Sequence, residues 1–349
     1  MPHRVAIQAD DYGPRDASSP LWTRLLREAG HEVVPVEVRR ADILQQVSGC
    51  DGFMWRFAHA PSDRAIARRL FPVLERSLGL AVYPDQATAW HFDDKIAQAW
   101  LLESAGVPVP RTWVWFDRDA AARWAREAAF PIVLKLASGA GATNVRRIES
   151  RDEALLWVER LFGPGLFDLA EAEEPVLRRE ARLLKSVGEG LIEGRAPSES
   201  LRARAGAELH RGYALFQEFL PGNEFDTRVT VIGRRAFAYR RFNRPGDFRA
   251  SGSGNFDPDP SKIDPAAVRL ALDTARRLGT QSCAMDILKR GEERVVAEVS
   301  YAYVSWMVQS CPGHWDAAEG GPMWRDGALW PEEAQIADFL ARLAARRAA

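Results

Sequence analysis

The stretch CAMDILKRGEERVVAEVSYAY, residues 283–303, decides the fold prediction for this chain. Two apolar runs, Ala284–Leu288 and Arg294–Val299, flank a short charged turn that contains glycine, and this pattern predicts a β-hairpin. Each run contains one acid, Asp286 or Glu298, and a hairpin of this length can bring the two carboxylates side by side. An acid among apolar neighbours is costly to bury without a compensating charge.

The acid pair has two interpretations. A hard cation such as Mg²⁺ would supply the missing charge through oxygen ligands, and this ion commonly arrives with a substrate phosphate. Alternatively, the hairpin lies at a sheet edge and both acids face water. The other segments of the chain favour the metal interpretation.

Composition excludes several classes of protein. A length of 349 residues predicts two or three domains, and a hydrophobic fraction of 46% is enough for a sizeable core. Lys+Arg 47 against Asp+Glu 48 gives a net charge of −1, which favours neither nucleic acid nor an anionic membrane as a partner. The three cysteines form no CxxC pair, so neither a disulfide framework nor a zinc site is expected. Without an N-terminal leader pattern or an 18-residue apolar run, we expect a cytoplasmic protein.

Residues 1–92 alternate short strands with helices, which predicts an N-terminal parallel α/β domain. The expected strands are 5–8, 32–38, 52–56 and 80–83, and the expected helices are 21–29, 42–47 and 64–78.

Residues 93–162 predict a second, smaller α/β unit. Lys135 ends an apolar strand and precedes a loop, residues 137–143, that contains Gly139 and Gly141. Small residues let backbone N–H groups approach a polyphosphate, and a lysine there supplies a point charge. The alternative is a plain turn between strands, since the Walker pattern GxxxxGK[ST] is absent. Residues 163–211 are then rich in charge and predict a helical insertion, either a solvated linker or a binding element.

Residues 212–349 predict a mainly antiparallel α+β domain, with strands 213–220, 225–232 and 235–242 and a helix over 265–278 before the hairpin. Seven arginines fall between Arg228 and Arg249, and an inward-facing subset would suit a phosphate that develops charge during transfer. Four tryptophans follow in the tail, which contains a turn-like segment at residues 311–314 and ends in an expected helix over 334–345. These tryptophans either pack in the core or border an acceptor site; they are Trp306, Trp315, Trp324 and Trp330.

Five segments in order give this chain a family resemblance. They are Asp94-Lys95, the strand 131–135 with its glycine-rich loop, Gln217-Glu218-Phe219-Leu220 with Gly222-Asn223-Glu224, the arginine strand with Phe248-Arg249, and the pair Asp286 and Glu298. In this order they resemble the ATP-grasp superfamily, most closely the ligases typified by ribosomal-protein glutamate ligase and D-alanine–D-alanine ligase. The resemblance spans residues 92–303.

The resemblance implies an ATP-grasp fold: a parallel α/β domain, a small central lid subdomain and a C-terminal, mainly antiparallel sheet. It also implies a role for each matching position. Lys95 and Lys135 would contact the ATP phosphates and the adenine edge, and the loop with Ser138, Gly139, Gly141 and Thr143 would close over the phosphates. Gln217, Glu218, Phe219 and Leu220 would form the adenine hinge, and Glu224 would bind the ribose. Asp286 and Glu298 would hold two Mg²⁺, and Arg241 and Arg228 would stabilise the transferring phosphoryl group.

One position departs from the family pattern. The family usually has asparagine two residues after the second metal acid, and here Ser300 stands in that place as the third expected ligand. A serine oxygen has a shorter reach.

The implied reaction is the ATP-dependent joining of a carboxylate to an amine through an acylphosphate, on small-molecule or peptide substrates, with a homodimer as a family expectation. The alternatives are a phosphotransferase of the same fold and a nucleotide-binding regulatory protein without turnover, which the serine at position 300 would favour.

Overall fold

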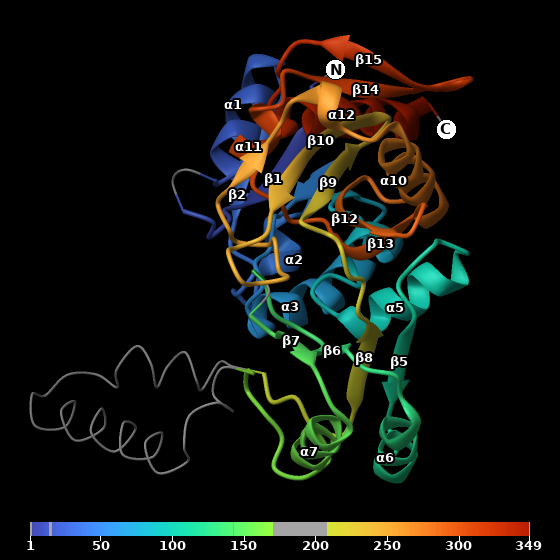
Figure 1. Cartoon of the computed structure of the whole chain (residues 1–349). Coiled ribbons are helices and arrows are strands. Elements are labelled where there is room, and N and C mark those ends of the chain that lie inside the picture. Colours follow the sequence, from blue (N-terminus) through green and yellow to red (C-terminus); the bar gives the residue numbers. More distant parts are fainter. Residues whose placement is uncertain (1, 14–15, 142, 170–207, 349) are drawn as a thin grey trace, which may run out of the picture.

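The computed structural model describes residues 2–13, 16–141, 143–169 and 208–348. Within these residues the strands form three sheets, of four, seven and four strands. One four-stranded sheet, with α6 and α7, forms the end of the molecule that lies lowest in Figure 1. Most of the expected charged insertion, residues 170–207, lies outside the described residues.

The first sheet is parallel, as predicted, with strand order β2-β1-β3-β4. Its strands are β1 (Arg4–Gln8), β2 (Glu32–Val36), β3 (Gly52–Met54) and β4 (Ala81–Tyr83). The helices are α1 (Ser19–Glu28), α2 (Ile43–Gln46), α3 (Pro61–Pro72) and α4 (Gln86–Ala89). A π-helical turn, η1 (Val73–Ser77), continues α3 after Pro72. Proline has no N–H to donate, which interrupts the α-helical ladder there.

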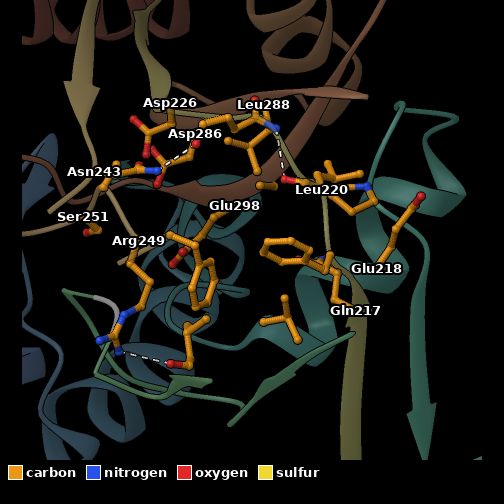
Figure 2. A pocket seen from close by; sticks show the side chains of 18 of the residues that line it. Gln217, Glu218, Leu220, Asp226, Asn243, Arg249, Ser251, Asp286, Leu288 and Glu298 are labelled. Atoms are coloured by element: carbon orange, nitrogen blue, oxygen red, sulfur yellow. Dashed lines mark hydrogen bonds between the residues drawn. The ribbon is translucent and has the colours of Figure 1, made fainter. Parts of the chain in front are cut away.

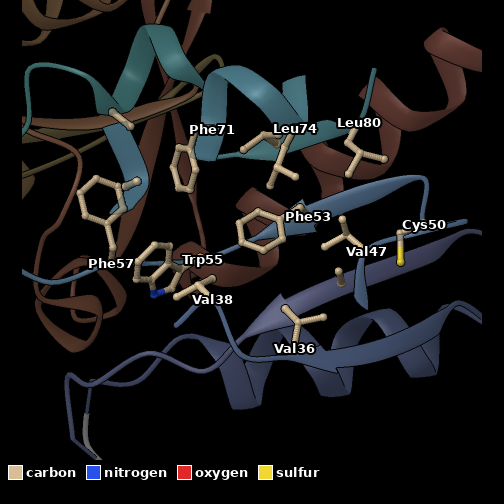
Figure 3. Packing of buried hydrophobic residues seen from close by; sticks show 14 of the residues in the cluster. Val36, Val38, Val47, Cys50, Phe53, Trp55, Phe57, Phe71, Leu74 and Leu80 are labelled. Carbon is tan, nitrogen blue, oxygen red and sulfur yellow. The ribbon is translucent and has the colours of Figure 1, made fainter. Parts of the chain in front are cut away.

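Aromatic rings fill the core on one face of this sheet (Figure 3). Phe71 packs edge-on against Phe53 and Phe57, at centroid distances of 5.9 and 5.6 Å. Phe57 also contacts Tyr301, at 5.0 Å, and Tyr301 comes directly after the second strand of the predicted hairpin. The N-terminal core therefore extends onto the end of that strand and fixes its position.

The other face of the first sheet is covered by α1 and by the last helix, α12 (Pro331–Ala348). Ile336, Phe339 and Leu343 of α12 pack against β1 and β3, and the Trp22 indole N–H donates to Gln335 Oε1 at 2.8 Å. The two ends of the chain are thus packed together (Figure 1). Neither α12 nor another helix in the described ranges has the length and apolar character needed to cross a bilayer.

The second sheet is antiparallel, with strand order β5-β8-β6-β7. Its strands are β5 (Thr112–Trp115), β6 (Ile132–Lys135), β7 (Val145–Ile148) and β8 (Ala214–Glu218). Helix α5 (Lys95–Ser104) precedes it, and α6 (Arg118–Glu127) and α7 (Arg151–Phe162) cover one face. Strand β8 follows the expected boundary at residue 212, yet it pairs between β5 and β6 in this sheet.

The third sheet contains the predicted hairpin and has strand order β13-β12-β9-β10-β14-β15. Its strands are β9 (Phe225–Ile232), β10 (Arg235–Phe242), β12 (Ser282–Arg290), β13 (Glu293–Ser300), β14 (Gly313–Ala318) and β15 (Gly321–Asp326), with β11 (Phe256–Asp257) paired to β10. A short 3₁₀ turn, η3 (Pro260–Lys262), and α11 (Ser305–Gln309) lie in the connections.

Helix α10 (Pro265–Leu278) forms where the sequence predicts it and packs on one face of the third sheet. Its start has Asp264 as N-cap, with the carboxylate accepting from the Ala266 N–H at 2.9 Å. Its end has Gly279 at φ 66°, a left-handed conformation that glycine adopts without strain.

The tryptophan-rich tail corrects the sequence interpretation. We expected a turn-like segment at residues 311–314, whereas β14 begins at Gly313 and forms with β15 a hairpin that extends the third sheet. Trp315 and Trp324 are cross-strand partners whose rings lie 4.6 Å apart, so they stabilise this hairpin. Trp306 packs against Phe256 and remains 45% exposed.

Candidate functional site

A cavity of about 340 Å³ lies between the second sheet and the β12–β13 hairpin (Figure 2). Its volume is in the range of small-molecule sites. The lining includes eight of the predicted site residues: Lys135, Gln217, Glu218, Phe219, Leu220, Glu224, Asp286 and Glu298. Three separate stretches of sequence therefore meet at one cavity. None of the four tail tryptophans lines it.

One part of the cavity is apolar. Val133 and Val145 come from the second sheet, and Leu288 comes from β12. The rings of Phe219 and Phe248 meet nearly at right angles, with centroids 5.7 Å apart. These walls suit a flat, uncharged ring system such as a nucleobase.

The side chain of Glu218 points away from the apolar part and holds the hinge in place. Its carboxylate accepts from the Arg111 backbone N–H at 3.1 Å and from Arg290 Nη1 at 3.4 Å. Burial alone would raise the pKa of Glu218, but the hydrogen bonds from Arg111 and Arg290 outweigh burial. The pKa of Glu218 is therefore below its usual value. Glu218 therefore fixes β8 to two neighbouring segments, and its backbone remains beside the cavity.

The rim of the cavity carries Glu224, which is exposed. No hydrogen bond or ion pair reaches its carboxylate from the described part of the chain. The turn before it is held by Asn223, which accepts from the Lys289 N–H at 2.9 Å and donates to Leu220 O at 3.3 Å. Glu224 is thus placed at the rim by a fixed turn and is available to accept hydrogen bonds from hydroxyl groups.

Four charged side chains form a buried network behind the polar end of the cavity. Arg241 is bidentate on Asp226, at 2.8 and 2.6 Å, and its Nη2 also lies 2.7 Å from Asp286 Oδ2. Arg228 Nε donates to Asp286 Oδ1 at 2.7 Å. The pairing follows from register, because Arg228 lies opposite Asp286 and Arg241 lies opposite Asp226.

The network separates the pKa values of its two acids. Burial opposes ionisation of Asp286, but Arg228 and Arg241 outweigh burial and hold the pKa of Asp286 below its usual value. Burial and the negative charge of Asp286 raise the pKa of Asp226, and Arg241 only partly opposes them. Asp286 is therefore the acid of the pair that ionises more readily.

Asp286 and Glu298 are direct cross-strand partners, as predicted. Within the described residues no set of three or more His, Cys, Asp or Glu side chains could hold a metal ion. The pair nonetheless fits Mg²⁺ brought by a nucleotide, which needs only one or two protein carboxylates. The Glu298 carboxylate has no hydrogen-bond or ion-pair partner among the described residues, and the Asp286 oxygens keep free lone pairs beyond their arginine contacts.

Ser300 differs from the expectation. It lies on the same face of β13 as Glu298, but it is absent from the cavity lining and its hydroxyl donates to Ala302 O at 2.7 Å. This local bond satisfies the hydroxyl, so its role as a third ligand stays a prediction.

Lys135 lies at the end of β6 and lines the cavity with the two acids. Burial lowers the pKa of its ammonium to about 8, because the charges of Glu298 and Asp286 only partly compensate for lost hydration and Lys95 adds repulsion. A nearby polyanion would therefore stabilise the charged form of Lys135.

The glycine-rich loop and Lys95 lie outside the cavity lining. Lys95 Nζ donates to Gly139 O at 2.9 Å, so in this structure it holds the loop. Ser138 is buried, and its hydroxyl contacts His210 Nε2 at 3.3 Å. Contact of Lys95 and of the loop residues Ser138, Gly139, Gly141 and Thr143 with phosphates therefore stays a prediction.

The sequence analysis missed several lining residues. Asp226 is an acid two positions before Arg228 on an apolar strand, and the reasoning applied to Asp286 would have found it. Asn243 and Arg249 line the cavity from the segments after β10. Arg249 Nη1 also donates to Val145 O at 3.2 Å, which ties this segment to the second sheet (Figure 2). No local signal separated Asn243 from an ordinary loop residue, whereas Arg249 was one of the seven arginines from which an inward-facing subset was expected.

Comparison with known structures identifies the fold. The ligase PsnB complexed with a minimal precursor is similar over 98% of this chain and 99% of its own, with a TM-score of 0.57 and 18% identity. D-Alanine–D-alanine ligase from Bacillus anthracis is similar over 99% and 98%, with a TM-score of 0.51 and 12% identity. This chain has the ATP-grasp fold. The predicted resemblance and fold class are thereby confirmed.

Sequence comparisons agree with the fold. Residues 187–308, less than half of this ATP-grasp chain, match the RimK-like ATP-grasp domain. A curated relative, the α-aminoadipate–LysW ligase LysX of Saccharolobus solfataricus, is 24% identical over 86 residues, which are 25% of this chain. The match spans 31% of the length of that relative.

Proposed function

We propose that this ATP-grasp protein is an ADP-forming ligase that joins a carboxylate to an amine. The observation that carries the proposal is the cavity itself, which combines an apolar slot, a partly buried lysine and a cross-strand acid pair. These are the three requirements for binding a nucleotide with its base, its phosphates and a cation. The similarity to ligases of the same fold supports the same assignment.

The chain's own residues would bind ATP in a defined orientation. Phe219, Leu220 and Phe248 would enclose the adenine, and the backbone of the hinge would read its edge. Glu224 would accept hydrogen bonds from the ribose, and Lys135 would contact the phosphates, as Lys95 would if it left the loop carbonyl. This orientation directs the γ-phosphate toward Asp286 and Glu298.

Asp286 and Glu298 would hold Mg²⁺, whose chemistry is to neutralise charge on the phosphate oxygens. Arg228 and Arg241 would keep Asp286 ionised and oriented, and they add positive charge beside the transferring group. The closed loop with Ser138 and Gly139 would exclude water.

The proposed reaction has two steps. A carboxylate oxygen of the acid substrate bonds to the γ-phosphorus while the bond to the β–γ bridging oxygen breaks, and ADP leaves with the electron pair. The amine nitrogen then attacks the acyl carbon, phosphate leaves, and the nitrogen loses a proton to give the amide. The acid and the amine are small molecules or peptides, and the structure of PsnB complexed with a precursor peptide supports the peptide choice. We also propose that the protein is a cytoplasmic homodimer and that it uses ATP together with two Mg²⁺.

The test is a screen of acid and amine pairs for ADP release in the presence of Mg²⁺, followed by mass analysis of the product. We expect ADP only when both substrates are present, and a product equal to acid plus amine minus water. A product that gains a phosphoryl group without amine would identify a phosphotransferase instead. Binding of ATP without turnover of any pair would favour the regulatory alternative.

A further inference from the structure

The start of the glycine-rich loop is held by side chains from outside the loop. The Gly139 N–H donates to Asp93 Oδ1 at 2.8 Å, and Lys95 Nζ donates to Gly139 O at 2.9 Å. Asn144 Nδ2 donates to Ser138 O at 2.8 Å. The N–H and the carbonyl of Gly139 and the carbonyl of Ser138 are therefore held in place without a nucleotide.

His210 and Tyr213 extend this anchoring, and the direction of each hydrogen bond can be worked out. The Ala137 N–H donates to the Tyr213 hydroxyl at 2.8 Å, and the hydroxyl hydrogen is free to donate to His210 Nδ1, also at 2.8 Å. Burial lowers the pKa of His210, which favours the neutral ring. The proton then sits on Nε2, which donates to the Ser138 hydroxyl at 3.3 Å.

The anchoring groups are themselves held from the N-terminal part of the chain. Arg64 of α3 donates to Asp93 O at 3.0 Å and pairs with Glu208. Burial alone would raise the pKa of Glu208, but hydrogen bonds from Arg64 and Ser138 outweigh burial. The pKa of Glu208 is therefore below its usual value. His59 Nδ1 lies 3.2 Å from Asp93 Oδ2. Three separate parts of the chain thus converge on three loop residues, Ala137, Ser138 and Gly139.

The backbone at the anchor requires glycine. Gly139 has φ of +120°, and a Cβ there would lie 2.6 Å from Asn144 Nδ2. Glycine adopts a positive φ readily, whereas an L side chain at this position would be strained. The anchoring contacts are therefore specific to one loop geometry.

We propose that His210, Tyr213 and Asp93 are positioning residues that preorganise the glycine-rich loop for the ATP phosphates. The inference rests on the proposed function for the identity of the ligand. The segment that returns to the second sheet at residues 208–213 thereby sets nucleotide affinity without touching the nucleotide. A loop that is already ordered loses less conformational entropy on binding.

The test uses the full-length protein with His210→Ala and His210→Gln. The matched control is His31→Ala, because His31 lies in the connection before β2 and outside this network. We expect the dissociation constant of ATP with Mg²⁺, measured by calorimetry, to rise about five- to tenfold in His210→Ala. His210→Gln keeps a donor for Ser138 and should stay within about twofold of the wild type, as should the control. In turnover, KM for ATP should rise while the KM values for acid and amine stay unchanged.

A second measurement separates this inference from the proposed function. Hydrogen exchange of a peptide covering residues 132–141, without nucleotide, should be faster in His210→Ala and unchanged in His210→Gln. If the wild type binds no ATP, the proposed function fails, and this exchange alone decides whether His210 anchors the loop. Unchanged exchange in His210→Ala, or an unchanged ATP affinity when the wild type binds ATP, would overturn the inference. A lower melting temperature with an unchanged KM for ATP would show a merely structural role, and would overturn it too.

Discussion

Replacing Asp286 by asparagine tests the buried charge network and the proposed site together. The two Asp286 oxygens accept from Arg228 and Arg241, each at 2.7 Å, and the side chain is only 7% exposed. An asparagine has the same shape, but its single oxygen can face only one arginine. Its NH₂ group then points at the donors of the other, and Arg228 has no second partner among the described residues that would replace the acid.

The expected loss of stability is large for an isosteric change. Removing one partner of a buried ion pair lowers the free energy of unfolding by about 3–5 kcal/mol, because the remaining charge stays buried and unpaired. A melting temperature shifts by roughly 2–4 °C per kcal/mol in domains of 150–250 residues, so the expected fall is at least about 6 °C. Amide formation should fall by at least about 100-fold, since a ligand for the metal is lost along with its charge.

The assay compares thermal unfolding, ATP binding without Mg²⁺ and turnover in Asp286→Asn and Asp273→Asn. Asp273 is the matched control, because it also contacts two arginines, Arg276 and Arg277, but on the exposed side of α10. A surface pair of this kind contributes about 0–1 kcal/mol. ATP without metal should bind Asp286→Asn at least as tightly as the wild type, because a negative charge near the phosphates is gone. Equal melting temperatures in the two variants would refute the buried network, and retained turnover in Asp286→Asn would refute the site.

Three further outcomes follow from single contacts. Burial lowers the pKa of Lys135 to about 8, so in the free protein the ammonium is charged below that pH and neutral above it. The ATP dissociation constant should therefore rise by up to tenfold per pH unit above about pH 8. A flat pH profile, identical to that of Lys135→Arg, would contradict this prediction. Gly139→Ala should weaken ATP binding at least fivefold in a titration, since its Cβ would meet Asn144 Nδ2 at 2.6 Å, and an unchanged affinity would show that the loop geometry is unimportant. Gly52→Ala should lower the free energy of unfolding by about 1–3 kcal/mol in chemical denaturation, because the alanine Cβ would lie 2.6 Å from the buried Phe339 ring. An unfolding free energy equal to that of the wild type would mean that the ring shifts freely.

Local sequence determined most elements of this protein. The strand pair around Asp286 and Glu298 could be predicted because two apolar runs with one acid each leave few conformations besides a hairpin. Helix α10 could be predicted because Asp264, Pro265 and Gly279 mark its ends. The tail hairpin could not, since its polar and aromatic residues gain their strand conformation from pairing with β10.

Tertiary structure decided which predicted residues share one site. Lys135 and Glu298 lie far apart in the chain and meet because the second sheet packs over the β12–β13 hairpin. Lys95 and Ser138 were expected at the phosphates together with Lys135, yet folding turned them to the loop anchor that includes His210. Spacing along a chain fixes which face of a strand a side chain occupies, but the partner that the face meets depends on how the sheets pack together.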